Sequence, residues 1–150
     1  MKLATALSER ADLQRRLTQL QTRLNNNAKV QEGEKPAEDP ADLLRELEGV
    51  ITRLEELVTR INLTNSQTFA DGVSMTALLA KRDCLSKKLA VLRDFLDNAS
   101  ARVDRYSQKE IRILSTVDVA KLQKQVDDLS KELRLIDEQI QGLNWTTDLL

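Results

Sequence analysis

Leucine spacing is the feature of this sequence that most limits its possible folds. Three segments place aliphatic residues at alternating steps of three and four, and one segment carries a broader apolar stripe. Such spacing keeps apolar side chains on one side of an α-helix and is typical of coiled coils. The pattern predicts helices at about residues 2–24, 40–63, 75–108 and 119–141, with the broader stripe in the second.

Polar segments separate these predicted helices. Residues 25–39 contain Gly33, Pro36 and several acidic side chains, which indicate a loop. Asp39 and Pro40 then form a strong helix start, because Asp is a good N-cap and proline is tolerated at the first helical position. Gly142 indicates the end of the last helix, so residues 142–150 are predicted as a C-terminal tail.

The composition favours an all-α fold in one domain, residues 1–150. Hydrophobic residues make up 41% of the chain but aromatic residues only 3%, so the core is aliphatic. We expect long antiparallel helical hairpins or a four-helix, coiled-coil-like bundle. A short non-helical break, rich in β-branched residues that favour an extended passage, is predicted near residues 109–118. Narrow seams leave apolar surface uncovered, so we also expect a homo-oligomer.

The charge pattern excludes several classes of partner. The net charge is -1, which gives no overall attraction to duplex nucleic acid or to an anionic membrane. No apolar run is long enough to span a bilayer, and the first residues lack the apolar block of a signal peptide. We therefore expect a cytoplasmic protein with neither duplex nucleic acid nor membrane as a partner.

The absence of histidine argues against an enzyme. It removes the commonest general base, the commonest metal ligand and every Ser-His or Cys-His pair. Cys84 is the single cysteine, and its leucine-rich neighbourhood predicts a small buried apolar side chain. We predict no catalytic residues, no metal site and no cofactor.

The break itself is the strongest candidate for a binding site. Arg102, Arg105, Lys109 and Arg112 follow one another at steps of three, four and three residues around Tyr106, the only tyrosine. On one helical face these cations would repel one another. A bound anion could relieve the repulsion, and so could carboxylates of other helices.

The C-terminal segment NWTTDLL is the second candidate. It places the only tryptophan, Trp145, beside Asn144, Thr146 and Thr147. Tryptophan is enriched in subunit interfaces, and its flat ring can also form the wall of a ligand pocket. The sequence leaves both interpretations open.

Several motifs of this chain resemble the septicolysin-like family of small bacterial and phage helical proteins. They are MKLATALSERADLQRRL, NNNAKVQEGEKPAEDP, RINLTNS, RYSQKEI, STVDVAKLQKQVDDL and NWTTDLL, which together span nearly the whole chain. The resemblance implies an all-helical, oligomeric protein whose typical motifs are polar. The family name suggests a cytolysin, but the chain has no membrane-length apolar segment that would support pore formation.

These features lead to a hypothesis of a non-catalytic homo-oligomer that binds a small anionic, nucleotide-like ligand in pockets between subunits. In a phage, such a protein could sequester a signalling nucleotide of the host. The predicted ligand-binding residues are Arg102, Arg105, Tyr106, Ser107, Lys109, Glu110, Arg112, Asn144, Trp145, Thr146 and Thr147. The alternative is a structural or adaptor coiled coil that binds a protein partner.

Overall fold

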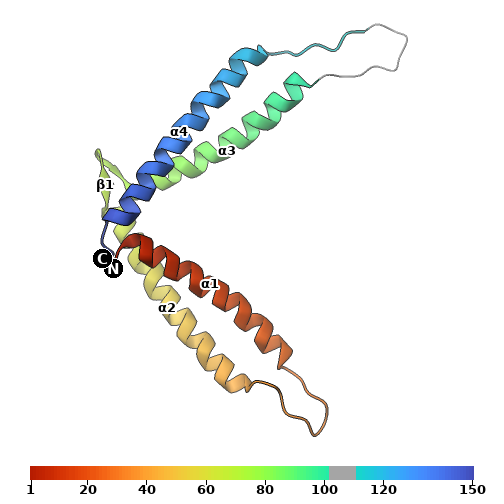
Figure 1. The fold of residues 1–150 in the computed structure, drawn as a ribbon, viewed down its shortest axis with the longest axis vertical. Coiled ribbons are helices and arrows are strands. Elements are labelled where there is room, and N and C mark those ends of the chain that lie inside the picture. The colour runs from red at the N-terminus through yellow and green to blue at the C-terminus, as the bar shows by residue number, and fades with distance from the viewer. Residues whose placement is uncertain (102–110) are drawn as a thin grey trace. The chain divides into compact units, whose positions relative to one another are not determined.

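A computed structural model describes residues 1–101 and 111–150, and it confirms the all-α fold. Figure 1 shows helices that run side by side in pairs, with a small strand pair between the second and third helices. The elements in chain order are α1 (Leu3–Asn26), α2 (Pro40–Gln67), β1 (Phe69–Ala70), β2 (Val73–Ser74), α3 (Met75–Ser100) and α4 (Val119–Thr146).

The predicted helix starts are confirmed by their caps. The Asp39 carboxylate accepts a hydrogen bond from the Ala41 backbone N–H at 2.9 Å, with Pro40 in the first turn of α2. The Asp118 carboxylate likewise accepts from the Lys121 N–H at 3.1 Å and caps α4. Local chemistry therefore decides where these two helices begin.

Three of the predicted helix ends are wrong, and the first is that of α2, which ends at Gln67 rather than residue 63. Helix α4 continues through Gly142 to Thr146, because a glycine inside a helix costs only about 1 kcal/mol and the Thr147 N–H still bonds to the Leu143 carbonyl at 2.9 Å.

Helix α3 ends at Ser100 rather than residue 108. The Ser100 hydroxyl donates to the Leu96 carbonyl at 2.7 Å, and such back-bonding weakens a helix locally. Residues 102–108 lie outside the described residues, and 111–118 are non-helical as predicted.

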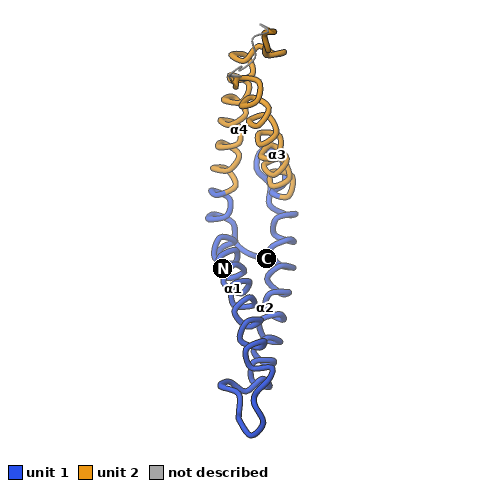
Figure 2. The backbone as a smooth tube through the Cα atoms, turned by 90° about the vertical axis from the view of Figure 1, so that its right-hand side faces the viewer, with its two compact units in different colours: residues 1–75, 141–150 blue, residues 76–140 orange. Residues whose placement is uncertain are grey.

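The chain forms two compact units, coloured separately in Figure 2. The first unit contains Met1–Met75 and Gln141–Leu150, and therefore α1, α2, the strand pair and the last residues of the chain. The second contains Thr76–Ile140, and therefore most of α3 and α4. Each unit holds one antiparallel helical hairpin.

A short β-hairpin between α2 and α3 was not predicted. Phe69 pairs with Ser74, and Ala70 with Val73. The two residues between the strands, Asp71 and Gly72, have φ angles of 51° and 79°. Asp-Gly is a favoured pair for tight hairpin turns with two positive φ angles, so this dipeptide was the available signal in the sequence.

The α1–α2 hairpin buries one complete column of residues from each helix, together with Leu3 and Ile61 near the chain ends of the two helices. Within a column the residues are seven apart, as in a coiled coil. The buried columns are Ala6, Leu13, Leu20 and Asn27 on α1, and Leu43, Val50, Leu57 and Thr64 on α2. The neighbouring column of α1, which contains Arg10, Leu17 and Leu24, is only half-buried. The leucine stripe is therefore only partly covered within this unit.

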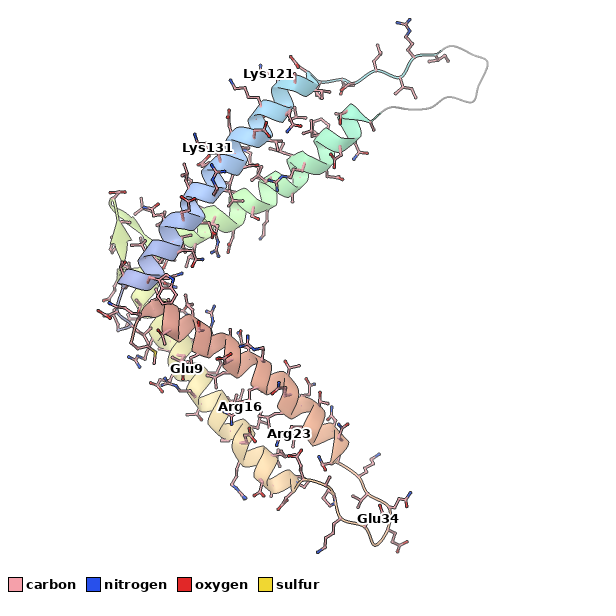
Figure 3. The ribbon with its side chains drawn as sticks, viewed as in Figure 1. Glu9, Arg16, Arg23, Glu34, Lys121 and Lys131 are labelled. Atoms are coloured by element: carbon pink, nitrogen blue, oxygen red, sulfur yellow. The ribbon has the colours of Figure 1, made fainter. Side chains whose placement is uncertain are left out.

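One edge of this hairpin carries a ladder of ion pairs, the charged ladder. Glu9, Arg16 and Arg23 are seven residues apart on α1 and are labelled in Figure 3. The guanidinium of Arg53 donates to the two Glu9 carboxylate oxygens at 2.7 and 3.0 Å. Arg16 lies 2.9 Å from Glu46, and Arg23 pairs with both Glu46 and Glu38. Seven-residue spacing of opposite charges on the two helices was the signal for this ladder.

Arg53 of the charged ladder lowers the pKa of two carboxyl groups that it contacts. Hydrogen bonds from the Arg53 guanidinium hold the pKa of Glu9 and of Glu56 below the ordinary value of 4.5. A carboxyl with a lowered pKa stabilises the fold above its unfolded pKa and loses this contribution as the pH falls through its folded pKa. The ladder should therefore be fully stabilising at pH 7 and weak in acid.

We expect Arg53→Ala to lower Tm at pH 7 by about 2 to 5 °C, because a bidentate pair linking two helices is lost. The control is Arg45→Ala, which removes an exposed arginine that pairs with Asp42 three residues away on the same helix. Thermal unfolding followed by circular dichroism at pH 7 and pH 3 gives both values. Equal Tm losses in the two variants, or an Arg53→Ala deficit that persists unchanged at pH 3, would contradict a stabilising ladder.

The α3–α4 hairpin packs through its own aliphatic cluster. Leu89 and Leu96 of α3 are buried with Leu122 and Val126 of α4. Polar contacts link the same helices, including Lys81 to Glu132 at 3.1 Å. Others run from Arg82 to Asp137 at 3.7 Å and from Arg93 to the Ser130 hydroxyl at 2.9 Å. This unit therefore has a core of its own.

The predicted burial of Cys84 is wrong, since its side chain is exposed. The packed face of α3 contains Leu78, Leu89 and Leu96, with Leu85 partly buried. Cys84 directly precedes Leu85, and successive residues point about 100° apart around a helix. A residue that is close to leucines in the sequence can therefore lie on a different face of the helix from them.

Candidate functional site

The predicted ligand-binding residues fall into three groups. Arg112 lies in the non-helical segment before α4, and Asn144 to Thr147 lie at the end of α4 and directly after it. The remaining predictions lie outside the described residues; these are Arg102, Arg105, Tyr106, Ser107, Lys109 and Glu110. The structure brings together the members of the C-terminal group, whereas Arg112 belongs to the other unit.

The C-terminal group takes part in a contact between the two chain ends, the terminal clasp, formed by residues 1–3 and 146–150. The Leu3 N–H donates to the Thr147 carbonyl at 2.9 Å, and the Leu149 N–H donates to the Met1 carbonyl at 2.8 Å. The Lys2 ammonium lies 2.9 Å from the Asp148 carboxylate, whose pKa it lowers. The two ends thus form a short antiparallel bridge.

Helix α2 holds the other side of the terminal clasp. The Leu150 N–H donates to the Thr64 hydroxyl at 3.0 Å, and the Arg60 guanidinium donates to the Leu150 carbonyl at 2.6 Å. Leu149 is 8% exposed and Thr64 1% exposed. The last three residues are therefore an integral part of the first unit.

The clasp assigns structural roles to several residues that were predicted to contact a ligand. The Thr146 hydroxyl donates to the Gly142 carbonyl of its own helix at 3.0 Å, and Asn144 is buried. The Thr147 backbone joins the two chain ends. Trp145 differs because 67% of it is exposed. Its ring is open to a partner, and a ligand role for this group stays a prediction.

A basic end lies at the start of α4 and consists of Arg112, Lys121 and Lys124. All three side chains are exposed, and none forms an ion pair with a carboxylate in the described part of the chain. Arg112 precedes the helix, while Lys121 and Lys124 lie in its first two turns. A helix N-terminus adds its own positive potential to such cations.

An open groove lies beside this basic end. It has a volume of about 370 Å³ and is lined by Lys121, Lys124, Gln125, Asp128 and Leu129. Two of its lining residues can donate ammonium hydrogen bonds, one is an amide, one is the carboxylate of Asp128 and one is apolar. Figure 3 labels Lys121 and, further along α4, Lys131.

The unpaired cations are concentrated in the second unit. That unit has 13 Lys and Arg against 11 Asp and Glu, whereas the rest of the chain has 10 against 13. Eight cations of the second unit have no ion pair within the described ranges: Lys87, Lys88, Arg93, Arg112, Lys121, Lys124, Lys131 and Arg134. The sequence left open that a carboxylate of another helix pairs with Arg112. No such carboxylate lies within ion-pair distance of Arg112 among the described residues.

A family model matches residues 10–149, and its description is a family of unknown function, DUF6847. The match covers nearly the whole chain. The chain belongs to this family. No curated protein matches the sequence. The resemblance to septicolysin-like proteins stays a prediction beside the DUF6847 assignment.

One solved structure supports the fold of this DUF6847 chain directly. It is described as the crystal structure of a functionally unknown conserved protein from Corynebacterium diphtheriae. The two proteins are 45% identical, the match covers 100% of this chain and 99% of that one, and the TM-score is 0.93. The helical architecture is therefore shared.

Two kinds of feature are absent from the part of the chain that the structure describes. No group of three or more His, Cys, Asp or Glu side chains in residues 1–101 and 111–150 could hold a metal ion. Within the same ranges, no helix combines the length and apolar character needed to cross a bilayer.

Proposed function

We propose that this DUF6847 protein is a non-catalytic binding protein for a small, phosphate-bearing, nucleotide-like ligand, held at the basic end of α4. One observation carries the proposal. Arg112, Lys121 and Lys124 are exposed and lack carboxylate partners among the described residues. By contrast, Arg16, Arg23, Arg53 and Arg60 of the charged ladder and its neighbours are all paired.

The chemistry of the basic end suits a phosphate group. An ammonium or guanidinium group forms charge-assisted hydrogen bonds to phosphate oxygens that are about twice as strong as neutral ones. Two lysines on successive turns of one helix can both reach a single phosphate or two linked phosphates. Leu129 in the groove adds an apolar surface on which part of a ring can lie.

The test is isothermal titration calorimetry of the full chain with inorganic phosphate, pyrophosphate and a panel of mono- and dinucleotides. We expect at least one of these ligands to bind, and we expect the double variant Lys121→Ala, Lys124→Ala to weaken it by about 10- to 100-fold, the usual cost of losing charge-assisted bonds. Arg112→Ala should weaken it in the same direction.

The control is the double variant Lys29→Ala, Lys35→Ala, which removes two exposed lysines of the loop between α1 and α2. It changes the net charge equally but leaves the basic end intact. Equal losses of ligand affinity in both double variants would show that the effect comes from net charge alone and not from the basic end. No binding heat with any phosphate-bearing compound would refute the proposal.

A protein-binding adaptor is the second candidate, and an exposed apolar pair on α3 favours it. Val91 and Phe95 are one turn apart and are 69% and 45% exposed. Pull-down with the full chain and with Val91→Glu would test this function. Loss of a specific partner in the variant, together with no response to phosphate compounds, would favour the adaptor.

We propose that the protein works in the cytoplasm, where nucleotide-like ligands are abundant. The exposed, unpaired thiol of Cys84 suits a reducing compartment. In a phage, binding without turnover would sequester a host signalling nucleotide.

A further inference from the structure

The two long edges of the α1–α2 hairpin differ in chemistry. One edge carries the charged ladder, in which Glu9 and Arg16 of α1 face Arg53 and Glu46 of α2. The opposite edge carries an apolar groove of about 360 Å³, lined by Leu17, Gln21, Leu24, Asn25 and Leu47. The groove therefore has no ion pairs to close it.

More apolar side chains extend this groove along α2. Leu44 and Ile51 are 55% and 40% exposed, and they occupy the position directly after the buried Leu43 and Val50. We define the groove face as Leu17, Leu24, Leu44, Leu47 and Ile51. Five large aliphatic side chains on one edge of a two-helix hairpin form a surface that a further pair of helices would bury.

Apart from Arg10, the α1 side of the groove face is uncharged. The positions beyond Leu17 and Leu24 on that side of the helix are Leu7, Ala11, Gln14, Thr18, Gln21 and Asn25. On α2, the corresponding border carries Glu48 and Glu55, each four residues after Leu44 or Ile51. Neither glutamate has an ion pair in the part of the chain that the structure describes.

Arg10 is the one cation on the α1 side. It shares a column with Leu17 and Leu24, seven and fourteen residues further on, so it lies on the same edge of the helix. Its Nε atom is buried and has no hydrogen-bond partner among the described residues. A buried donor without a partner is costly and points to a missing acceptor.

We propose that two copies of the chain pack their groove faces against each other around a two-fold axis, with α1 of each copy over α2 of the other. In a two-fold interface every contact occurs twice. Arg10 of each copy then meets Glu48 or Glu55 of the second copy, and the neutral side of α1 covers the acidic border of α2. The other arrangement, α2 on α2, would bring the four glutamates together.

The size of the surface suits a stable dimer. A helix of 24 residues is about 36 Å long, and two adjacent helices are about 20 Å wide. A contact over the whole of this side therefore covers about 700 Å² per copy, close to the roughly 800 Å² per partner of a typical specific interface. This proposal is independent of the anion site, since it involves only the first unit.

Analytical ultracentrifugation of the full chain over a wide concentration range tests the dimer. We expect the parent to sediment as a dimer of the 17.0 kDa chain. Ile51→Glu should raise the dimer Kd at least about tenfold, because it places a charge in the apolar centre of the contact. Thr52→Glu is the matched control, because it adds the same charge one residue away, at a position turned about 100° around α2 from Ile51.

A monomeric parent, or equal effects of Ile51→Glu and Thr52→Glu, would overturn the proposal. Circular dichroism establishes that each variant is folded, and Leu44→Glu, at a more exposed position, replaces Ile51→Glu if the latter unfolds.

A mixing experiment tests the orientation. Two variants should each be largely monomeric: Arg10→Glu, and the double variant Glu48→Arg, Glu55→Arg. In either one, position 10 of each copy would face side chains of the same charge at positions 48 and 55 of the other copy. Mixed together, the two variants should form a heterodimer with both charge contacts restored. The two-fold arrangement would be overturned if each variant alone were monomeric and the mixture formed no heterodimer.

Discussion

Leu57→Ala is expected to lower the free energy of unfolding by about 3 to 4 kcal/mol, within the range for removing a fully buried leucine. Leu57 is 0% exposed and lies in the middle of the buried α2 column between Val50 and Thr64. We expect the surrounding helices to close the resulting cavity only in part. Urea unfolding followed by circular dichroism measures the loss.

Leu63→Ala is the control for this prediction. It removes the same atoms from the same helix, but Leu63 is 46% exposed. We expect a change of less than about 1 kcal/mol, because exposed substitutions rarely cost more. Similar losses at positions 57 and 63 would show that the α2 column is not the core of this unit.

Deleting residues 148–150 should have the second large effect, a loss of about 3 kcal/mol. Burial of a leucine such as Leu149 contributes about 1.5 to 3 kcal/mol, and each lost hydrogen bond adds about 1 kcal/mol. The deletion removes the Leu149–Met1 and Leu150–Thr64 bonds and leaves the Arg60 guanidinium without its carbonyl acceptor.

Asp148→Asn provides the control for the clasp. It removes only the ion pair with Lys2, whose two side chains are 44% and 75% exposed, and it keeps the backbone bonds and Leu149. We expect the urea midpoint of unfolding of this variant to be close to that of the parent. If the truncated chain unfolded at the same urea concentration as Asp148→Asn, the clasp would be an incidental contact of the termini.

At the α1–α2 hairpin, local sequence patterns were sufficient for the helices but not for the contacts between them. The leucine spacing correctly predicted both helices, and Asp39-Pro40 correctly marked the start of α2. The charged ladder was present in the sequence as seven-residue spacing of Glu9, Arg16 and Arg23, but it had no meaning until Glu46 and Arg53 were known to face them. Such a ladder depends on which residues of the two helices lie opposite each other. The sequence does not determine this register, because the path of the loop that joins the helices is not known from it.

The candidate site divides in the same way. Of the three residues of the basic end, Arg112 was predicted from the sequence, whereas Lys121 and Lys124 were not. The role of Asn144 to Thr147 could not be anticipated, because the Lys2 contact with Thr146 spans 144 residues. Trp145 and the polar residues beside it suggested a subunit interface or a ligand pocket, and the structure adds that the backbone groups of Thr147 and Leu149 bond to the other end of the chain.

The sequence by itself determined the all-α class, the approximate helices and their capped starts, because helical periodicity and N-caps depend on residues within a few positions of one another. Only the tertiary structure decided the two units, the charged ladder, the terminal clasp and the groove face. Each of these depends on which faces of distant segments meet, and long-range packing chooses among faces that local patterns leave equivalent.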